Sequence, residues 1–328
     1  MPPSPVPAGQ SPTSSLDDDD VDSADLSDDP TSDSSRQSWQ RSNPTITDQY
    51  GVVIEGRRTY HGYMAGTYSL PNDGEEQQRL DMQHVLWNIV LDGALGIAPA
   101  CSETPSYVLD IGTGTGAWAN EFAEKNPTSQ VIGTDLSLIQ PSMASNVTFV
   151  VEDSEEQDWV FPHLFDYIHL RSMLVSLNDV TTILRRSLDH MTPGGWLEFQ
   201  DSSWELHSPD DSLEGTAIQR WSQCVLEGLA RNGHDTVSNL QALKTHLESV
   251  GFVDVKEKTF PVPGNGWMRR KPKMRHLGIF TGSIIVQALD AYRKVLGFAG
   301  LSDSEIDDLI EAAKSEVSNT DIHFFLRM

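Results

Sequence analysis

Cysteine, basic residues and long apolar runs are all scarce in this chain of 328 residues. Its two cysteines, Cys101 and Cys224, give neither a disulfide framework nor the spacing of a metal site, so we expect no bound metal and a reducing compartment. Lysine and arginine number 23 against 48 aspartates and glutamates, and the net charge of −25 argues against direct binding to nucleic acid. No apolar run approaches the roughly 18 residues of a membrane span, and no N-terminal stretch resembles a secretion signal. These absences predict an intracellular protein of the cytoplasm, the nucleus or both, without a membrane span.

Residues 1–48 lack glutamate and lysine altogether. They hold ten aspartates against only Arg36 and Arg41, and most of the remainder is serine, proline and other small or polar residues. Such a segment has too few large apolar side chains to offset the entropy lost on ordering. We therefore expect a disordered acidic tail, which is either a solubilising segment or an interaction and phosphorylation segment.

The middle of the chain alternates short apolar runs with amphipathic segments. Expected strands lie at 107–111, 130–134, 147–151, 165–170 and 195–200, with helices at 117–125 and 178–190. Strands alternating with helices predict a doubly wound, mostly parallel α/β sheet of the Rossmann-like kind. Outside this core we expect helices at 73–92, 211–231, 236–249, 273–296 and 303–317, a half-exposed strand over 251–260, and a last strand from 322.

The stretch from Val108 to Trp118 reads Val-Leu-Asp-Ile-Gly-Thr-Gly-Thr-Gly-Ala-Trp. A buried strand, a turn containing Gly112, Gly114 and Gly116, and a helix start let backbone N–H groups approach a ligand with no Cβ in the way. Asp135 ends the next strand, nineteen residues after Gly116, where a carboxylate can accept hydrogen bonds from ribose hydroxyls. This spacing predicts a site for a nucleoside-containing cofactor.

Two cofactors fit this pattern. Gly112, Gly114 and Ala117 also satisfy the permissive dinucleotide pattern, so NAD is the alternative. Asp110, however, stands two residues before the first glycine, where an anion suits the cationic methionine end of S-adenosylmethionine and opposes a pyrophosphate. The sequence therefore favours S-adenosylmethionine.

Further motifs resemble one family. They are Tyr60-His-Gly-Tyr63, Leu70-Pro-Asn-Asp73, Arg79-Leu-Asp81, His84, the glycine stretch, Val131–Pro141, Phe165–Ser172 and Pro193–Glu198. Together they resemble the LaeA-type fungal class I methyltransferases over about residues 55–328. The resemblance implies a seven-stranded Rossmann-like sheet whose last strand runs antiparallel and is here truncated at Met328.

The same resemblance implies a domain organisation and a function. A lid and helix would occupy 49–106, and the methyltransferase domain 107–328, with helical insertions around 202–235 and 265–320. The expected function is S-adenosylmethionine-dependent methyl transfer to a small molecule or a protein in fungal secondary metabolism, as a tailoring enzyme or as a regulator with a velvet-type partner protein. The alternative is a non-catalytic or weakly catalytic scaffold that binds partner proteins.

Several residues are candidates for the site. Asp153 matches the position where class I enzymes hold the adenine amino group, although it also belongs to an acidic loop in which Glu152 is a rival ligand. His169 is a candidate general base or a structural histidine, and Arg171 shares its strand end and its face. Tyr63 and His84 line the substrate pocket if the N-terminal helix acts as a lid, and otherwise pack in the core.

Two further features have weaker signals. Glu198 and Asp201 follow at the far end of a buried strand as possible substrate contacts. The basic run over 269–275 is either a solvated helix start or a nuclear-localisation or phosphate-binding patch.

Overall fold

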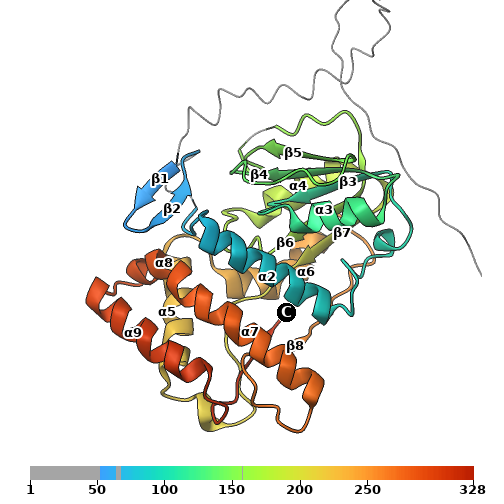
Figure 1. Cartoon of the computed structure of the whole chain (residues 1–328). Helices are drawn as coiled ribbons and strands as arrows, with labels where there is room; N and C mark the ends of the chain where they lie inside the picture. Colours follow the sequence, from blue (N-terminus) through green and yellow to red (C-terminus); the bar gives the residue numbers. More distant parts are fainter. Residues whose placement is uncertain (1–51, 64–67, 157) are drawn as a thin grey trace, which may run out of the picture. The chain divides into compact units, whose positions relative to one another are not determined.

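A five-stranded parallel sheet forms the centre of the computed structural model, which describes residues 52–63, 68–156 and 158–328 (Figure 1). The predicted tail over 1–48 lies outside these residues. The strands are β3 (Tyr107–Ile111), β4 (Gln130–Asp135), β5 (Val147–Val151), β6 (Phe165–Arg171) and β7 (Met191–Gln200). Their order is β5-β4-β3-β6-β7, and every neighbouring pair is parallel. The strand order therefore reverses beside β3, and ligands of open α/β sheets bind at the carboxyl ends of strands at such a point.

Helices cover both faces of this sheet. On one face Leu109 and Ile168 pack with α4 (Val180–Asp189) and α6 (Thr236–Val250). On the other face Val108 packs against α3 (Ala117–Lys125). The faces alternate because successive side chains of a strand point to opposite sides. The prediction of a parallel Rossmann-like sheet is confirmed.

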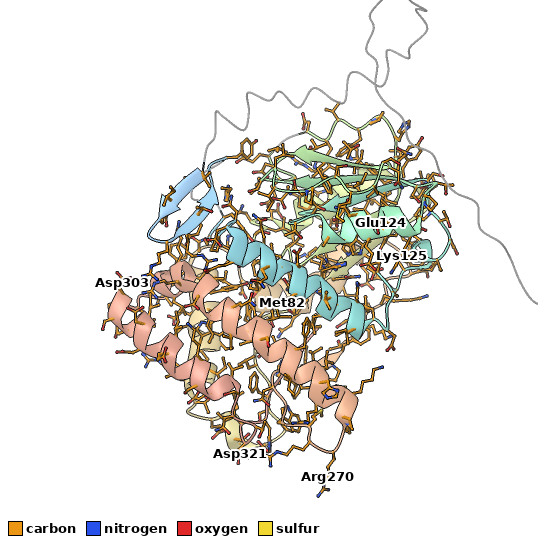
Figure 2. All side chains as sticks on the ribbon, in the orientation of Figure 1. Met82, Glu124, Lys125, Arg270, Asp303 and Asp321 are labelled. Carbon is orange, nitrogen blue, oxygen red and sulfur yellow. The ribbon has the colours of Figure 1, made fainter. Side chains whose placement is uncertain are left out.

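The remaining helices form a second layer with its own core. They are α2 (Gly74–Val90), α5 (Ala217–Arg231), α7 (Pro272–Ala291), α8 (Arg293–Phe298) and α9 (Asp303–Val317). Met82 projects from α2 where it packs against α7, and its sulfur accepts a hydrogen bond from Nε2 of Gln287 at 3.2 Å (Figure 2). The predicted helix 273–296 is divided between α7 and α8 at Tyr292. The predicted helix 211–231 begins later, because only the 3-10 turn η2 (Asp211–Leu213) precedes Gly215, whose φ of +72° is left-handed.

Helix α2 begins as expected at Asp73, whose side chain accepts a hydrogen bond from the backbone N–H of Glu76. The side chain of Glu76 does not complete the capping box, because it pairs with Arg79. The hairpin of β1 (Val52–Glu55) and β2 (Arg58–His61) precedes this helix, and the turn η1 (Pro99–Cys101) follows it. None of the helices in the described residues combines the length and apolar character of a membrane span.

The predicted seven-stranded sheet is wrong in its strand count. In the described part of the chain, β8 (Pro261–Pro263) and β9 (Phe325–Arg327) form a separate antiparallel pair, which does not join the five central strands. Pro261 and Pro263 have no N–H to donate, and this limits the number of interstrand hydrogen bonds that the segment can form. The strand expected over 251–260 is also absent, since Asp254 adopts a φ of +56° and Val253 is 82% exposed. The alternating residues of this segment therefore do not pack one side against a buried surface.

The contact between α7 and the loop after β8 predicts a large effect on stability. A Cβ at Gly278 would lie 1.9 Å from the backbone oxygen of Asn265, so Gly278→Ala should reduce the free energy of unfolding by about 3 kcal/mol. A Cβ at Gly297, in α8, would meet no atom within 4 Å, so Gly297→Ala should raise it by about 0.5–1 kcal/mol. Urea unfolding of both variants measures the difference, and a neutral Gly278→Ala would contradict this packing.

Candidate functional site

The glycine turn after β3 combines three left-handed residues with different surroundings. Gly112, Gly114 and Gly116 have φ values of +65°, +58° and +76°. A Cβ at Gly112 would lie 2.0 Å from Sδ of Met173, and one at Gly116 would lie 2.6 Å from the ring of Phe149. A Cβ at Gly114 would meet only a methyl carbon of Leu80, at 3.7 Å. A Cβ at Gly112 or Gly116 would therefore have to displace a neighbouring side chain, whereas Gly114 borders open space.

That open space belongs to the larger of the two cavities considered below, about 1210 Å³ including the part open to solvent. It lies at the carboxyl ends of β3, β4, β5 and β6, as the strand order predicts, and α2 contributes Gln77 and Leu80 to its wall. From the strand ends its lining residues are Gly112, Gly114, Asp135, Leu136, Ser137, Ile139, Glu152–Glu156 and Arg171–Met173. Of the predicted cofactor ligands, Gly112, Gly114, Asp135 and Asp153 are brought together here, and Asp110 and Gly116 are not among the lining residues.

Asp135 is held in place by backbone donors. One carboxylate oxygen accepts from the N–H of Gly114 at 2.9 Å, and the other accepts from the N–H of Ser137 at 3.0 Å. The backbone of Leu136 also bonds to this group, and with three donors the carboxylate keeps a lone pair for a ligand hydroxyl. Burial raises the pKa of Asp135 to about 6, although the hydrogen bonds from Ser137 and Gly114 act to lower it.

Asp110 lies below the turn and is 2% exposed. Its Oδ2 accepts from the hydroxyl of Thr113 at 2.6 Å, and its Oδ1 accepts from Nδ1 of His169 at 2.7 Å. The ring of His169 stacks on Trp118 with centroids 3.8 Å apart, and its Nε2 has no hydrogen-bond partner in the described part of the chain. This arrangement fixes the turn through Thr113. His169 is fully buried and lines neither cavity, so its role as a base stays a prediction without support from this geometry.

Arg171 and His84 connect β6 to the N-terminal helix. Arg171 lines the larger cavity and donates to Nδ1 of His84 at 3.0 Å, while Nε2 of His84 contacts a carboxylate oxygen of Glu121 at 2.6 Å. Burial lowers the pKa of Arg171 to about 10, and burial followed by the charge of Arg171 lowers the pKa of His84. His84 therefore ties α2 to α3 and β6 and lines neither cavity; nor does Tyr63, whose backbone oxygen accepts from Nδ1 of His61.

The acidic loop after β5 gives the larger cavity two candidate ligands. Asp153 lines the wall, and one of its oxygens accepts from the N–H of Glu155 at 2.9 Å. Glu152 lines the same wall, and burial raises its pKa to about 7. Both residues considered from the sequence thus stay candidates.

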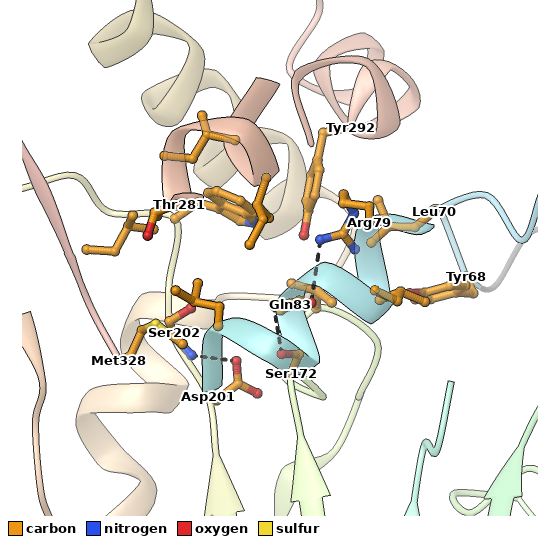
Figure 3. A pocket seen from close by; sticks show the side chains of 17 residues that line it. Tyr68, Leu70, Arg79, Gln83, Ser172, Asp201, Ser202, Thr281, Tyr292 and Met328 are labelled. Atoms are coloured by element: carbon orange, nitrogen blue, oxygen red, sulfur yellow. Dashed lines mark hydrogen bonds between the residues drawn. The ribbon is translucent and has the colours of Figure 1, made fainter. Parts of the chain in front are cut away.

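A smaller cavity of about 680 Å³ lies beside the larger one, because Tyr68, Leu80 and Ser172 line both (Figure 3). Sequence reasoning missed most of its polar residues, namely Arg79, Gln83, Ser172 and Tyr292. The Arg-Leu-Asp motif was the signal in the sequence that could have identified Arg79 as a site residue. Tyr292 lies more than two hundred residues away in the chain and belongs to no such motif. Asp201 lines this cavity as well; Glu198 instead accepts from the backbone N–H groups of Ile97 and Ala98.

These features define a Rossmann-like protein with a site that fits a nucleoside-containing cofactor. Gly114 faces open space and lets the ligand approach its backbone. Asp135, held by backbone donors at the end of β4, suits the ribose hydroxyls of such a molecule. The acidic loop after β5 suits its adenine amino group. The fit rests on the space beside Gly114 and on the lone pairs of Asp135.

Comparison with known proteins agrees with this site. The family described as "Methyltransferase domain" matches residues 88–257. The chain is 35% identical over 273 residues to methyltransferase pytC of Aspergillus terreus, covering 82% of this chain and 83% of that protein. It is 33% identical over 287 residues to the secondary metabolism regulator laeA of Aspergillus fumigatus, covering 85% and 75%. It is 32% identical over 303 residues to the protein-methionine methyltransferase laeA of Emericella nidulans, covering 88% and 79%.

Among solved structures, phosphoethanolamine N-methyltransferase 2 of Haemonchus contortus matches with a TM-score of 0.48 and 16% identity, covering 86% of this chain and 71% of that one. The chain belongs to the S-adenosylmethionine-dependent methyltransferases, and within them to the LaeA-like family. The predictions of fold class, enzyme class and cofactor are confirmed, and the dinucleotide alternative is set aside.

The raised pKa of Asp135 predicts a pH dependence of cofactor binding. Above pH 6 Asp135 is a carboxylate that accepts from ribose hydroxyls, and it loses this capacity as the pH falls through 6. The affinity for S-adenosylhomocysteine, measured by calorimetric titration, should therefore fall about tenfold from pH 8 to pH 5. Asp135→Asn should bind weakly at every pH.

Glu152→Gln is the matched control for this experiment, because Glu152 lines the same cavity with a pKa of about 7. This variant should keep the loss of affinity below pH 6. A flat profile in Glu152→Gln would assign the titration to Glu152 and contradict the role of Asp135.

Proposed function

We propose that this chain holds S-adenosylmethionine in the larger cavity through specific residues at the strand ends. Asp135 accepts hydrogen bonds from the ribose hydroxyls, and Asp153 accepts from the adenine amino group. Gly112 and Gly114 leave room for the methionine portion against the turn. The observation that carries this assignment is the carboxylate of Asp135, which is held by the backbone N–H groups of Gly114 and Ser137 and lines the larger cavity.

The bound cofactor supplies a methyl group that is already activated on a sulfonium. The chain therefore has to align the acceptor with that methyl group and exclude water, and it needs a base only if the acceptor must lose a proton. Asp110 acts at one remove, since it fixes the glycine turn through Thr113. The predicted interaction of Asp110 with the cationic methionine end stays part of this proposal, because its negative charge lies beneath the glycine turn.

The proposed setting is fungal secondary metabolism, inside the cell, in the cytoplasm or nucleus. The similarity to the methyltransferase pytC supports a catalytic role, proposed as tailoring of a small molecule, and the similarity to the secondary metabolism regulator laeA supports a regulatory role. In the regulatory role, the velvet-type partner protein expected from the sequence is part of the proposal. The second candidate is a scaffold that keeps the cofactor for stability, because a ligand bound only to the folded state stabilises it without any transfer.

Labelled S-adenosylmethionine separates these roles. The full chain is incubated with extract of the native organism, and methyl label is followed into precipitated protein and into an organic extract. Label in the organic fraction supports the tailoring role, and label in protein supports the regulatory role. Binding of S-adenosylhomocysteine without any transfer supports the scaffold and overturns the enzymatic proposal for this chain.

A further inference from the structure

The smaller cavity lies where a methyl acceptor has to lie. It shares Tyr68, Leu80 and Ser172 with the larger cavity, so a molecule inside it and the proposed cofactor lie against the same three residues. Its space of about 680 Å³ includes the part that is open to solvent. The cavity thus has the position of an acceptor pocket.

Most of this pocket is apolar and belongs to the second helical layer. Leu70, Leu86, Ile284 and Ile285 are each no more than 4% exposed, and Trp204 adds an aromatic surface. Figure 3 shows Asp201 and Ser172 next to the ends of two strands, with other lining side chains of the pocket above them. Such a lining favours a compact apolar or aromatic molecule over an extended polar peptide.

Two polar side chains meet at the floor of the pocket. The register pairs Arg171 of β6 with Gln200 of β7, and the N–H of Ser172 donates to the oxygen of Gln200 at 2.9 Å. Ser172 and Asp201 are the next residues of these neighbouring parallel strands, so they lie side by side at the end nearest the larger cavity. Both line the smaller cavity.

Asp201 is a buried carboxylate whose partners are backbone groups. It is 7% exposed and accepts from the N–H of Leu174 at 2.9 Å and of Ser202 at 2.7 Å. The backbone of Met173 also bonds to this group, and with three donors the carboxylate keeps a lone pair for a further donor. Burial raises its pKa to about 7, although the bonds from Leu174 and Ser202 act to lower it. A carboxylate in this state is suited to accept a proton near neutral pH.

Ser172 supplies the complementary donor. Its φ of +58° is left-handed, which is unusual for a residue other than glycine and is found at sites where a side chain must be aimed. Its Oγ accepts from Nε2 of Gln83 at 3.1 Å, and Oε1 of Gln83 accepts in turn from Arg79 at 3.5 Å. Because Oγ already accepts from Gln83, its own hydrogen is available to a ligand oxygen in the pocket.

The charges in the pocket select a neutral acceptor. Arg79 makes two hydrogen bonds to Glu76, at 2.6 and 2.9 Å, so its charge is compensated within α2. Asp201 then disfavours an anion. A hydroxyl group both accepts from Ser172 and donates to Asp201, which neither a carboxylate nor an ammonium group can do.

This inference rests on the proposed function. We propose that the smaller cavity binds a compact, largely apolar molecule that carries an aryl or enol hydroxyl, and that Asp201 is the base that deprotonates this hydroxyl. The acceptor oxygen forms the new C–O bond while the S–CH3 bond breaks, and the electron pair of that bond stays on sulfur. The hydroxyl proton passes to Asp201. The products are a methyl ether and S-adenosylhomocysteine, with the proton released to solvent from Asp201 afterwards.

Binding of two matched probes tests the pocket. In the presence of S-adenosylhomocysteine, 1-naphthol should bind at least about tenfold more tightly than naphthalene, as each lost hydrogen bond to a buried group costs about 1–3 kcal/mol. Ile284→Trp fills the pocket from α7 and should abolish this binding. Ile279→Trp, on the exposed side of the same helix, should leave it unchanged. Absent binding in wild type, or binding that survives Ile284→Trp, overturns the pocket assignment.

The proton transfer is tested by the pH profile of methyl transfer to 1-naphthol, recorded below the pH at which the free probe ionises. Asp201→Asn should lower the transfer rate constant about 100-fold or more and remove its rise through pH 7, with probe affinity nearly unchanged. Arg79 and Tyr292 also face the pocket, but their pKa values are raised, that of Tyr292 to about 12, so they do not titrate in this range.

Failure of this inference is distinguishable from failure of the proposed function. If S-adenosylhomocysteine does not bind wild type, the proposed cofactor site is wrong. If it binds every variant, but 1-naphthol is not methylated or Asp201→Asn keeps the wild-type rate and profile, the role of Asp201 is wrong. Label transferred to protein methionine, which needs no base, would likewise exclude a hydroxyl acceptor.

Discussion

Gly114→Val will weaken the binding of S-adenosylhomocysteine at least about 100-fold. The branched side chain would project into the larger cavity, where a Cβ meets only Leu80, and it would also have to adopt a φ of +58°. A left-handed residue with a Cβ is strained by roughly 1–2 kcal/mol, and the lost space adds to this. Calorimetric titration measures the loss of affinity.

Gly215→Val is the matched control, because Gly215 has a φ of +72° and open surroundings but lines neither cavity. It carries the same backbone strain without blocking the ligand, so it should bind as wild type does. If Gly114→Val also bound as tightly as wild type, the assignment of the larger cavity to the cofactor would fall.

Glu76→Gln will reduce the free energy of unfolding by about 3–5 kcal/mol. Glu76 and Arg79 are 1% and 3% exposed, and the substitution leaves the guanidinium buried without its anionic partner. Burial by itself lowers the pKa of Arg79, but Glu76 outweighs this and holds the pKa above its usual value, so the group does not escape by losing its proton. Urea unfolding measures the change.

Two further variants separate the buried pair from salt bridges in general. Glu76→Leu combined with Arg79→Met should recover most of the lost stability, because a buried pair replaced by apolar groups leaves no unpaired charge. Glu227→Gln breaks the half-exposed pair with Arg231 and should cost less than about 1 kcal/mol. A double variant as unstable as Glu76→Gln would contradict the argument.

The cofactor side of the molecule was predictable because its signals are local. The glycine turn, the apolar run before it and Asp135 at the end of the next run lie within thirty residues, and strand–turn–helix chemistry follows from those residue types alone. The bounds of β3, α3 and β5 agree with the prediction for the same reason. The side chain of Asp110 does not line the larger cavity but contacts His169, because the register of β3 and β6 pairs these two residues.

The smaller cavity was not predictable because its walls come from distant segments. Tyr292 and Ile284 reach Arg79 only after α7 has packed on α2, and no spacing within either segment encodes that contact. Periodicity also failed over 251–260, where the alternating pattern lacks a second buried surface, and Val253 faces solvent. Local patterns specify single elements, whereas a pocket between elements depends on tertiary packing.

Helix α2 forms part of the wall of both cavities through Leu80, and His84 fastens it to α3 and β6. The proposed cofactor and acceptor sites therefore share one wall. Any factor by which one ligand changes the affinity for the other holds equally in the reverse direction, since the free energy of coupling is reciprocal.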